Sequence, residues 1–203
     1  MIDWDERYDT SEYIYGVEPN DFLCIHADRL ASGRTLCLAE GEGRNAVFLA
    51  RQGHAVTAVD SSSVALKKAQ RLAQSEGVQI STVHTDLADF EIGIERWDNI
   101  VSIFCHVPPD LRRRLHAAVV EGLKPGGMLL LEAYTPRQIT LGTGGPPVPE
   151  LTMTLDALRE ELAGLDFVHA METEREVIEG IYHTGRGAVV QILARKPTSN
   201  GHQ

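Results

Sequence analysis

The fold of this chain is decided by the stretch Leu38-Ala39-Glu40-Gly41-Glu42-Gly43-Arg44-Asn45-Ala46. An apolar run over 35–39 precedes the glycines and is typical of a strand buried on both faces. A helical pattern over 45–51 follows them, and Gly53 closes it in the left-handed conformation. The paired glycines let the backbone turn tightly and approach a ligand, and the helix N-terminus offers unpaired N–H groups to an anion. We therefore predict a strand, a ligand-binding turn and a helix, with a plain structural turn as the alternative.

Apolar runs and helical patterns alternate on the C-terminal side of this turn. Further strands are predicted over 54–59, 78–83, 97–104 and 128–131. Helices are predicted after Ser62 or Ser63 and after Asp110, which suit the capping position. Upstream, Pro19 suits the first turn of a helix that ends at Gly33. This alternation predicts a parallel, doubly wound sheet whose ligands lie beyond the carboxyl ends of the strands.

The last third of the chain has a different pattern. Glycines and prolines over 140–150 predict a loop, and a helix is predicted over 155–162. Two strand patterns, 167–177 and 187–194, then follow with no helix between them, which predicts an antiparallel hairpin. We predict an α/β, Rossmann-like, three-layer α/β/α fold with a mostly parallel seven-stranded sheet and an antiparallel C-terminal hairpin strand. A single domain over 1–203 includes an N-terminal cover over 1–32 and a possible substrate loop over 134–154.

Composition excludes several classes of function. The chain has 203 residues, with 19 Lys and Arg against 29 Asp and Glu, a formal charge of −10. This balance argues against a nucleic-acid partner, and the run Arg112-Arg113-Arg114 is interpreted as a solvent-facing helix surface. Three cysteines without a Cys-x-x-Cys pair predict a reducing compartment. The sequence shows no apolar run of membrane-spanning length and no metal-ligand pattern, so we expect a cytoplasmic protein with no membrane partner and no metal.

Two acidic residues stand at the ends of predicted strands. Asp60 ends the second strand, 17 residues after Gly43, where a carboxylate can accept both hydroxyls of a ribose. Asp86 follows the third strand and can accept from an adenine amine. The alternatives are a helix cap for Asp60 and an ordinary surface position for Asp86. The spacing Gly41-x-Gly43-x-x-Ala46 fits a nicotinamide dinucleotide as well as S-adenosylmethionine (SAM).

The motifs taken together resemble class I SAM-dependent methyltransferases over roughly residues 35–133. Besides the glycine turn and Val59-Asp60, the series consists of Thr85-Asp86-Leu87, Trp97-Asp98-Asn99-Ile100-Val101-Ser102 and Leu123-Lys124-Pro125-Gly126-Gly127. The Gly43-Arg44-Asn45 ending, Trp4-Asp5-Glu6-Arg7-Tyr8, Tyr15-Gly16 and Pro19-Asn20 are similar to the tellurite-resistance and thiopurine methyltransferase branch. A nicotinamide enzyme has no reason to carry the whole set.

The resemblance implies which residues bind the cofactor. They are Arg7, Tyr15, Glu40, Gly41, Gly43, Asn45, Asp60, Ser61, Asp86, Leu87 and Phe104. Arg7 would meet the methionine carboxylate, and Tyr15 would stack over the cofactor or only hold the N-terminal segment. This chain departs from the family pattern where Cys37 replaces the usual motif acid and Ala39 the first motif glycine. We therefore expect Glu40 or Glu42, or other groups, to receive the methionine ammonium.

The predicted function is methyl transfer from SAM to a small-molecule acceptor by in-line displacement. His106, just past the fourth strand, is the candidate general base, and a structural histidine is the alternative. Glu132, Tyr134 and Arg137 follow the fifth strand and are weaker candidates for the pocket. Two other functions stay open: a SAM-binding regulatory or partner protein without transfer activity, and a nicotinamide oxidoreductase. The sequence leaves the acceptor and the oligomeric state open.

Overall fold

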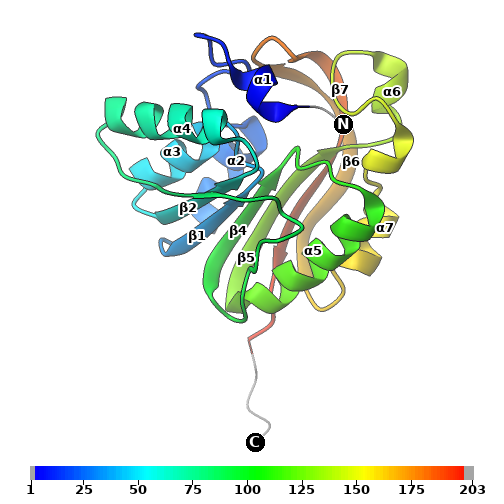
Figure 1. The fold of residues 1–203 in the computed structure, drawn as a ribbon. Coiled ribbons are helices and arrows are strands. Elements are labelled where there is room, and N and C mark those ends of the chain that lie inside the picture. Colours follow the sequence, from blue (N-terminus) through cyan, green and yellow to red (C-terminus); the bar gives the residue numbers. More distant parts are fainter. Residues whose placement is uncertain (1–2, 199–203) are drawn as a thin grey trace, which may run out of the picture.

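Seven strands form one sheet in the order β3-β2-β1-β4-β5-β7-β6 in the computed structural model, which describes residues 3–198 (Figure 1). The strands are β1 (Arg34–Leu38), β2 (Ala55–Asp60), β3 (Ser81–His84), β4 (Trp97–Ile103), β5 (Leu123–Tyr134), β6 (Asp166–Glu179) and β7 (His183–Arg195). The first five strands pair in parallel, and β7 runs antiparallel to both β5 and β6. The predicted mostly parallel sheet with an antiparallel hairpin strand is confirmed.

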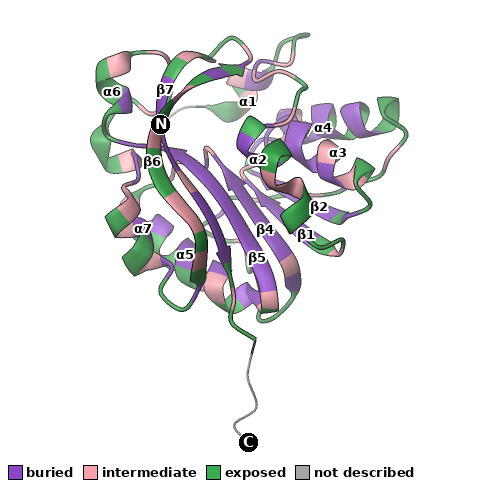
Figure 2. Ribbon diagram, turned by 180° about the vertical axis from the view of Figure 1, so that it is seen from behind, coloured by how far each residue is buried: buried purple, intermediate pink, exposed green. Residues whose placement is uncertain are grey.

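Helices cover both faces of this sheet (Figures 1 and 2). They are α1 (Trp4–Tyr8), α2 (Asp21–His26), α3 (Arg44–Arg51), α4 (Ser63–Ser75), α5 (Pro109–Gly122), α6 (Gln138–Leu141) and α7 (Leu155–Glu161), with short 3-10 turns at Ala27–Arg29 and Pro149–Leu151. Leu36 and Leu38 pack in one core with α5 and α7, whereas Cys37 between them packs in a second core with α2, α3 and α4. Side chains that alternate along a strand face opposite sides, so β1 is buried on both.

Several element boundaries differ from the sequence prediction. Helix α5 begins at Pro109, so Asp110 lies inside its first turn and does not cap it; proline suits this place because its missing N–H needs no partner. Pro19 likewise precedes the cap of α2, where the Asn20 side chain accepts from the Leu23 amide at 3.0 Å. Strand β5 begins at Leu123, five residues before the predicted start at 128, and its pairing with β4 is irregular between Leu123 and Met128.

The glycine- and proline-rich stretch after β5 is held against the sheet. Helix α6 begins just before it and ends within it, and Gln138 is fully buried. The Gln138 side chain donates to the carbonyl of Gly144 at 3.0 Å and accepts from the amide of Ala188 at 2.8 Å. The predicted loop is therefore fixed to β7 by a buried amide side chain. Over residues 3–198, no helix combines the length and apolarity that crossing a membrane requires.

Arg112 is buried, which contradicts the interpretation of all three arginines at 112–114 as a solvent-facing surface. Its guanidinium binds the Glu161 carboxylate of α7 at 2.8 Å, and His116 Nδ1 lies 2.6 Å from the same carboxylate. These hydrogen bonds hold the pKa of Glu161 at about 2 against the opposing effect of burial. Arg113 and Arg114 are exposed as predicted. The difference comes from tertiary packing, because Glu161 of α7 lies against the side of α5 that carries Arg112 and not against the sides that carry Arg113 and Arg114.

We expect Glu161→Gln to lower the free energy of unfolding at pH 7 by about 3 kcal/mol, because it leaves buried Arg112 without its counter-charge. The Glu161 pKa is depressed from 4.5 to about 2. Its contribution is therefore complete above pH 4.5 and is lost as the pH falls toward 2. Urea unfolding at pH 7 and pH 3 should show the variant approaching the wild type in acid. Arg113→Gln, at an exposed neighbour, is the control, and equal stability of Glu161→Gln and wild type at pH 7 would contradict this account.

Candidate functional site

The turn between β1 and α3 uses left-handed backbone at three positions. Ala39, Gly41 and Gly43 have φ values of 47°, 63° and 93°. Gly43 caps α3 and lies against α4, where a Cβ added to it would stand 2.6 Å from Ala69 Cβ. A side chain at this position would push the two helices apart. The predicted need for glycine at 43 thus has two causes, a left-handed cap and close helix packing.

Asp60 joins this turn to the next one. One carboxylate oxygen accepts from the amide of Gly41 and the other from the amide of Ser62, both at 2.8 Å. Burial raises the pKa of Asp60, although these hydrogen bonds oppose the shift. Each oxygen has a second lone pair, so the carboxylate retains the capacity to accept further hydrogen bonds.

Glu40 lies behind the turn with its carboxyl at the start of α3. It accepts from the amide of Ala46 at 2.7 Å, and burial raises its pKa to about 7. Cys37 is fully buried beside it, and burial together with the Glu40 charge raises the pKa of the thiol. A carboxyl thus lies next to position 37, although the residue at 37 carries none.

Glu42 has a different environment. Its carboxylate forms an ion pair with Lys68 Nζ at 2.7 Å, and both side chains are 2% exposed. The other oxygen accepts from the amide of Tyr15 at 3.3 Å, while Lys68 also donates to the carbonyl of Glu12 at 2.6 Å. Of the two acids predicted to receive an ammonium, Glu42 is therefore already neutralised and holds the N-terminal segment.

The N-terminal segment and the β6–β7 turn meet above the glycine turn (Figure 1). Asp5 of α1 accepts from the Ser62 hydroxyl at 2.6 Å, and the Tyr8 hydroxyl lies directly over Gly41. The amide of Ile181 in the β6–β7 turn donates to the carbonyl of Ile14 at 2.9 Å. Two segments distant in sequence thus close the same end of the sheet.

A buried ionic network holds this hairpin to the sheet. Arg175 of β6 binds Glu132 of β5 at 2.6 Å and Glu179 at 2.9 Å. Glu179 also pairs with Arg44 at the start of α3. The Asn20 side chain donates to Glu132 at 2.6 Å and to Glu179 at 2.9 Å, so each buried charge has a partner.

The other predicted cofactor residues are near this end of the sheet but have different surroundings. Asn45 is buried and accepts from the amide of Asn20 at 2.9 Å. Asp86 is exposed and accepts from the amide of Ala88 at 2.8 Å. Ser61 is exposed, whereas Leu87 is part of the core. Their roles toward a cofactor stay predictions.

His106 makes a hydrogen bond with each ring nitrogen. Nδ1 lies 2.8 Å from the carbonyl of Leu151, and Nε2 accepts from the amide of Tyr134 at 3.3 Å. Burial lowers its pKa to about 4, so the imidazole is neutral at pH 7. These contacts fit the structural alternative, because proton transfer at either nitrogen requires a backbone hydrogen bond to break. The role as general base stays a prediction.

Sequence reasoning missed His183 and the neighbouring Tyr182. The His183 ring centroid lies 4.9 Å from that of Phe104, 4.7 Å from Tyr15 and 5.3 Å from Tyr134. The Arg7 guanidinium lies 4.1 Å from the ring centroid of Tyr182. The only local signal was the pair of glycines at 180 and 185, which indicate a turn but not where it folds back.

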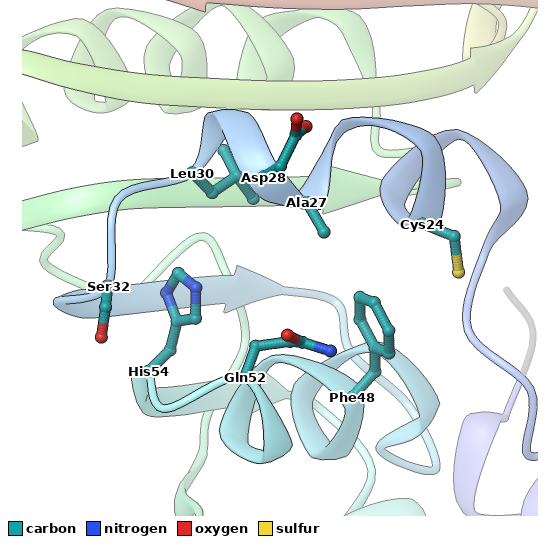
Figure 3. Close-up of a pocket in the computed structure, with 8 residues that line it drawn as sticks. All are labelled: Cys24, Ala27, Asp28, Leu30, Ser32, Phe48, Gln52 and His54. Atoms are coloured by element: carbon teal, nitrogen blue, oxygen red, sulfur yellow. The ribbon is translucent and has the colours of Figure 1, made fainter.

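A shallow hollow of about 410 Å³ lies at the opposite end of the sheet (Figure 3). Its lining includes Ser32, just before β1, and His54, just before β2, together with Phe48 of α3. None of the predicted cofactor residues lines it. Within residues 3–198, no group of three His, Cys, Asp or Glu side chains is placed to hold a metal ion.

Residues 36–127 match the family model described as "Methyltransferase domain". Among solved structures, one concerned with conversion of a disulfide bond into a thioacetal group during echinomycin biosynthesis is 21% identical, with a TM-score of 0.75 over 97% of this chain and 89% of that one. TehB from Haemophilus influenzae is 21% identical, with a TM-score of 0.72 over 95% of this chain but only 65% of TehB. A SAM-dependent methyltransferase from Methanosarcina mazei is 19% identical, with a TM-score of 0.70 over 90% of this chain and 100% of that one. No curated protein matches the sequence significantly.

The match to a methyltransferase domain covers 92 of the 203 residues, and it agrees with the fold and with the position of the glycine turn. The predicted resemblance to SAM-dependent methyltransferases is confirmed, and with it the predictions of an enzyme of this class and of SAM as its cofactor.

We expect Gly43→Ala to lower the free energy of unfolding by about 3 kcal/mol, because it combines left-handed strain with a clash against Ala69. Gly77→Ala is the matched control: its φ is 69°, but no atom lies within 4 Å of an added Cβ. It should lose only about 1 kcal/mol. Urea unfolding of both variants measures the difference, and equal losses would rule out the packing contribution at Gly43.

Proposed function

We propose that this protein transfers the SAM methyl group to a small-molecule acceptor by in-line displacement. SAM, when bound, supplies a methyl carbon already activated by its positive sulfur, so the protein has mainly to bind, orient and exclude water. The observation that carries the proposal is the pair of buried carboxyls, Glu40 and Asp60, which flank the glycine turn at the carboxyl ends of β1 and β2.

The proposed cofactor contacts follow from the groups at this edge. Asp60 would accept the ribose hydroxyls through its remaining lone pairs, and Asp86 would accept from the adenine amine. Arg7 Nε is buried with no partner among residues 3–198, which fits a guanidinium that meets the methionine carboxylate. Tyr15 and Phe104 would cover the cofactor, whereas Gly41, Gly43 and Asn45 would shape the turn beneath it. Ser61 and Leu87 are the remaining two residues proposed to contact the cofactor.

Glu40 is the proposed partner of the methionine ammonium. Its carboxyl lies beside Cys37, where the family pattern has an acid, and Glu42 is already paired with Lys68. Binding of a cation to a buried carboxyl with a raised pKa favours the ionised form. In this chain the carboxyl near the end of β1 is thus carried by residue 40, whereas in the family pattern it is carried by the residue at position 37.

The first test is thermal unfolding with candidate cofactors. We expect SAM and its demethylated product, S-adenosylhomocysteine, to raise the melting temperature, and NAD(H) not to do so, because only bound ligands stabilise the folded state. Asp60→Ala should reduce the shift. Failure of both SAM and its product to stabilise the protein would overturn the proposed function, and a shift with NADH instead would favour the nicotinamide alternative.

The second test separates the Glu40 contact from the other cofactor contacts. We expect Glu40→Gln to weaken S-adenosylhomocysteine binding at pH 8 by about tenfold, because the amide has no charge for the ammonium. 5′-Methylthioadenosine lacks the amino-acid part, so its affinity should change little. Because the Glu40 pKa is about 7, wild-type affinity for S-adenosylhomocysteine should be roughly tenfold weaker at pH 6 than at pH 8.

Titration calorimetry at pH 6 and pH 8 measures both effects in the second test. The Glu40→Gln variant should lose the pH dependence, and its new carboxamide oxygen can still accept from the Ala46 amide. Asp60→Ala is the contrast, because it should weaken both ligands. Equal weakening of both ligands by Glu40→Gln would assign Glu40 to the structure of the turn only.

A SAM-binding regulatory or partner protein without transfer activity is the second candidate. The motivating observation is that Cys37 and Ala39 replace expected motif residues. Tight cofactor binding with no demethylated product in a broad acceptor screen would favour it; the screen should contain small thiols and the oxyanions of tellurium and selenium.

The proposed setting is the cytoplasm, with no nucleic-acid or membrane partner. Cys24, Cys37 and Cys105 are free thiols, as expected in a reducing compartment. The net charge of −10 disfavours phosphate-backbone binding.

A further inference from the structure

Three of the five buried polar side-chain atoms that have no hydrogen-bond partner within residues 3–198 belong to one corner of the molecule. They are Arg7 Nε, Tyr134 Oη and His183 Nδ1. Buried polar atoms are almost always paired, and leaving one unpaired costs about 1–3 kcal/mol. Arg7 stacks on Tyr182, the residue before His183, and the Tyr134 and His183 rings are nearly perpendicular at 88°. Such a concentration of unpaired atoms indicates a place where a ligand supplies the missing partners.

The side chains around Tyr134 and His183 form an aromatic wall. Phe104 stacks on Tyr134 with ring centroids 4.5 Å apart, and Tyr15 packs on His183 at 4.7 Å. Phe104 directly follows β4 and lies in the left-handed region with a φ of 50°, which strains a residue that has a side chain. The Phe104 ring lies in this cluster, with its centroid also 4.9 Å from that of His183. The wall consists of aromatic rings, and the two buried polar atoms without partners, Tyr134 Oη and His183 Nδ1, belong to two of these rings.

This wall carries no uncompensated charge. Burial raises the pKa of Tyr134 far above neutrality, so its hydroxyl stays a hydrogen-bond donor. Burial also lowers the pKa of His183 to about 3, so its ring is neutral. The charged groups that face His183 are Glu179, Arg44 and Arg7; the first two pair with each other, and Arg7 is the proposed partner of the methionine carboxylate. An oxyanion would find no free positive charge among these groups.

We propose that Tyr134 and His183 are the acceptor-binding pair of the transfer site, and that they take an uncharged, flat small molecule whose nucleophilic heteroatom carries a proton. This inference rests on the proposed function and specifies its acceptor. Tyr134 Oη donates to the acceptor heteroatom, and His183 Nδ1 accepts the proton of that heteroatom. The wall of Phe104 and Tyr15 holds the body of the molecule.

The reaction balances without a further reagent. As the acceptor heteroatom bonds the methyl carbon, the bond from that carbon to sulfur breaks and its electron pair stays on sulfur, which becomes an uncharged thioether. His183 Nδ1 takes the acceptor proton and later releases it to solvent. A neutral histidine with a depressed pKa is a weak base. A weak base is sufficient here, because the acceptor proton becomes strongly acidic once the heteroatom has begun to bond to the methyl carbon.

The test uses full-length protein saturated with S-adenosylhomocysteine and three probes. Phenol has a flat body and an O–H, anisole has the same body without the O–H, and selenite is an oxyanion. Dissociation constants come from titration calorimetry. We expect phenol to bind at least tenfold more tightly than anisole, and selenite not to bind. Tyr134→Phe and His183→Phe should each reduce the preference for phenol to less than threefold.

His169→Phe is the matched control. His169 Nε2 is also buried without a partner, but its ring lies 5.4 Å from Phe22 of α2, away from this wall. The control should keep the tenfold preference. Tyr134→Phe should leave thermal stability equal or higher, because it removes a buried unpaired hydroxyl.

A kinetic measurement distinguishes the two roles. With phenol as acceptor and SAM as donor, Tyr134→Phe should raise KM for phenol, whereas His183→Phe should lower kcat. If S-adenosylhomocysteine binds but phenol binds no better than anisole, or selenite binds in preference, the inference is overturned while the proposed function stands. If S-adenosylhomocysteine itself does not bind, both are overturned.

Discussion

The Asp60 carboxylate is the constraint on which the candidate site depends, because it accepts from the amides of two different strand-to-helix turns. Parallel strands bring their carboxyl ends to one edge, but they do not by themselves fix how the following turns lie. By bonding Gly41 and Ser62, one carboxylate sets the N-termini of α3 and α4 side by side. Gly43 then permits those helices to touch at Ala69. The predicted ribose ligand is therefore also a structural bridge, whereas the predicted alternative, a helix cap, falls to Ser62 and not to Asp60.

The arrangement of strands could be predicted because parallel strands buried on both faces leave continuous apolar runs. The predicted ends of two elements were wrong. Helix α5 begins at Pro109, one residue before Asp110, and β5 continues through 124–127 because its backbone pairs irregularly with β4. The prediction that Arg112 faces solvent was wrong for another reason. Its burial depends on Glu161, 49 residues away, and no pattern within one helix reveals such a partner.

The candidate site shows the same division between local and distant information. The glycine turn and Asp60 could be found because their spacing is local and the sheet order brings them together. The aromatic wall could not, because His183 reaches Phe104 and Tyr15 only through the length of the hairpin, which extends past the predicted ends of both strands. The network around Glu132 and Glu179 holds that hairpin in place, and its members come from four separate elements.

Charge is divided between the two sides of this site, and the division has an energetic reason. Glu40 and Asp60 both have raised pKa values. At a pH above the ordinary pKa of a carboxyl, ionising these buried groups therefore costs free energy that exposed carboxyls would not cost, and this lowers the stability of the folded state. A cationic ligand that binds the ionised forms recovers this free energy, whereas the neutral aromatic wall has none to recover. The same fold therefore favours a cation beside the glycine turn and an uncharged molecule beside Tyr134. The proposed pair, a positively charged methyl donor and a neutral acceptor, matches this distribution of charge.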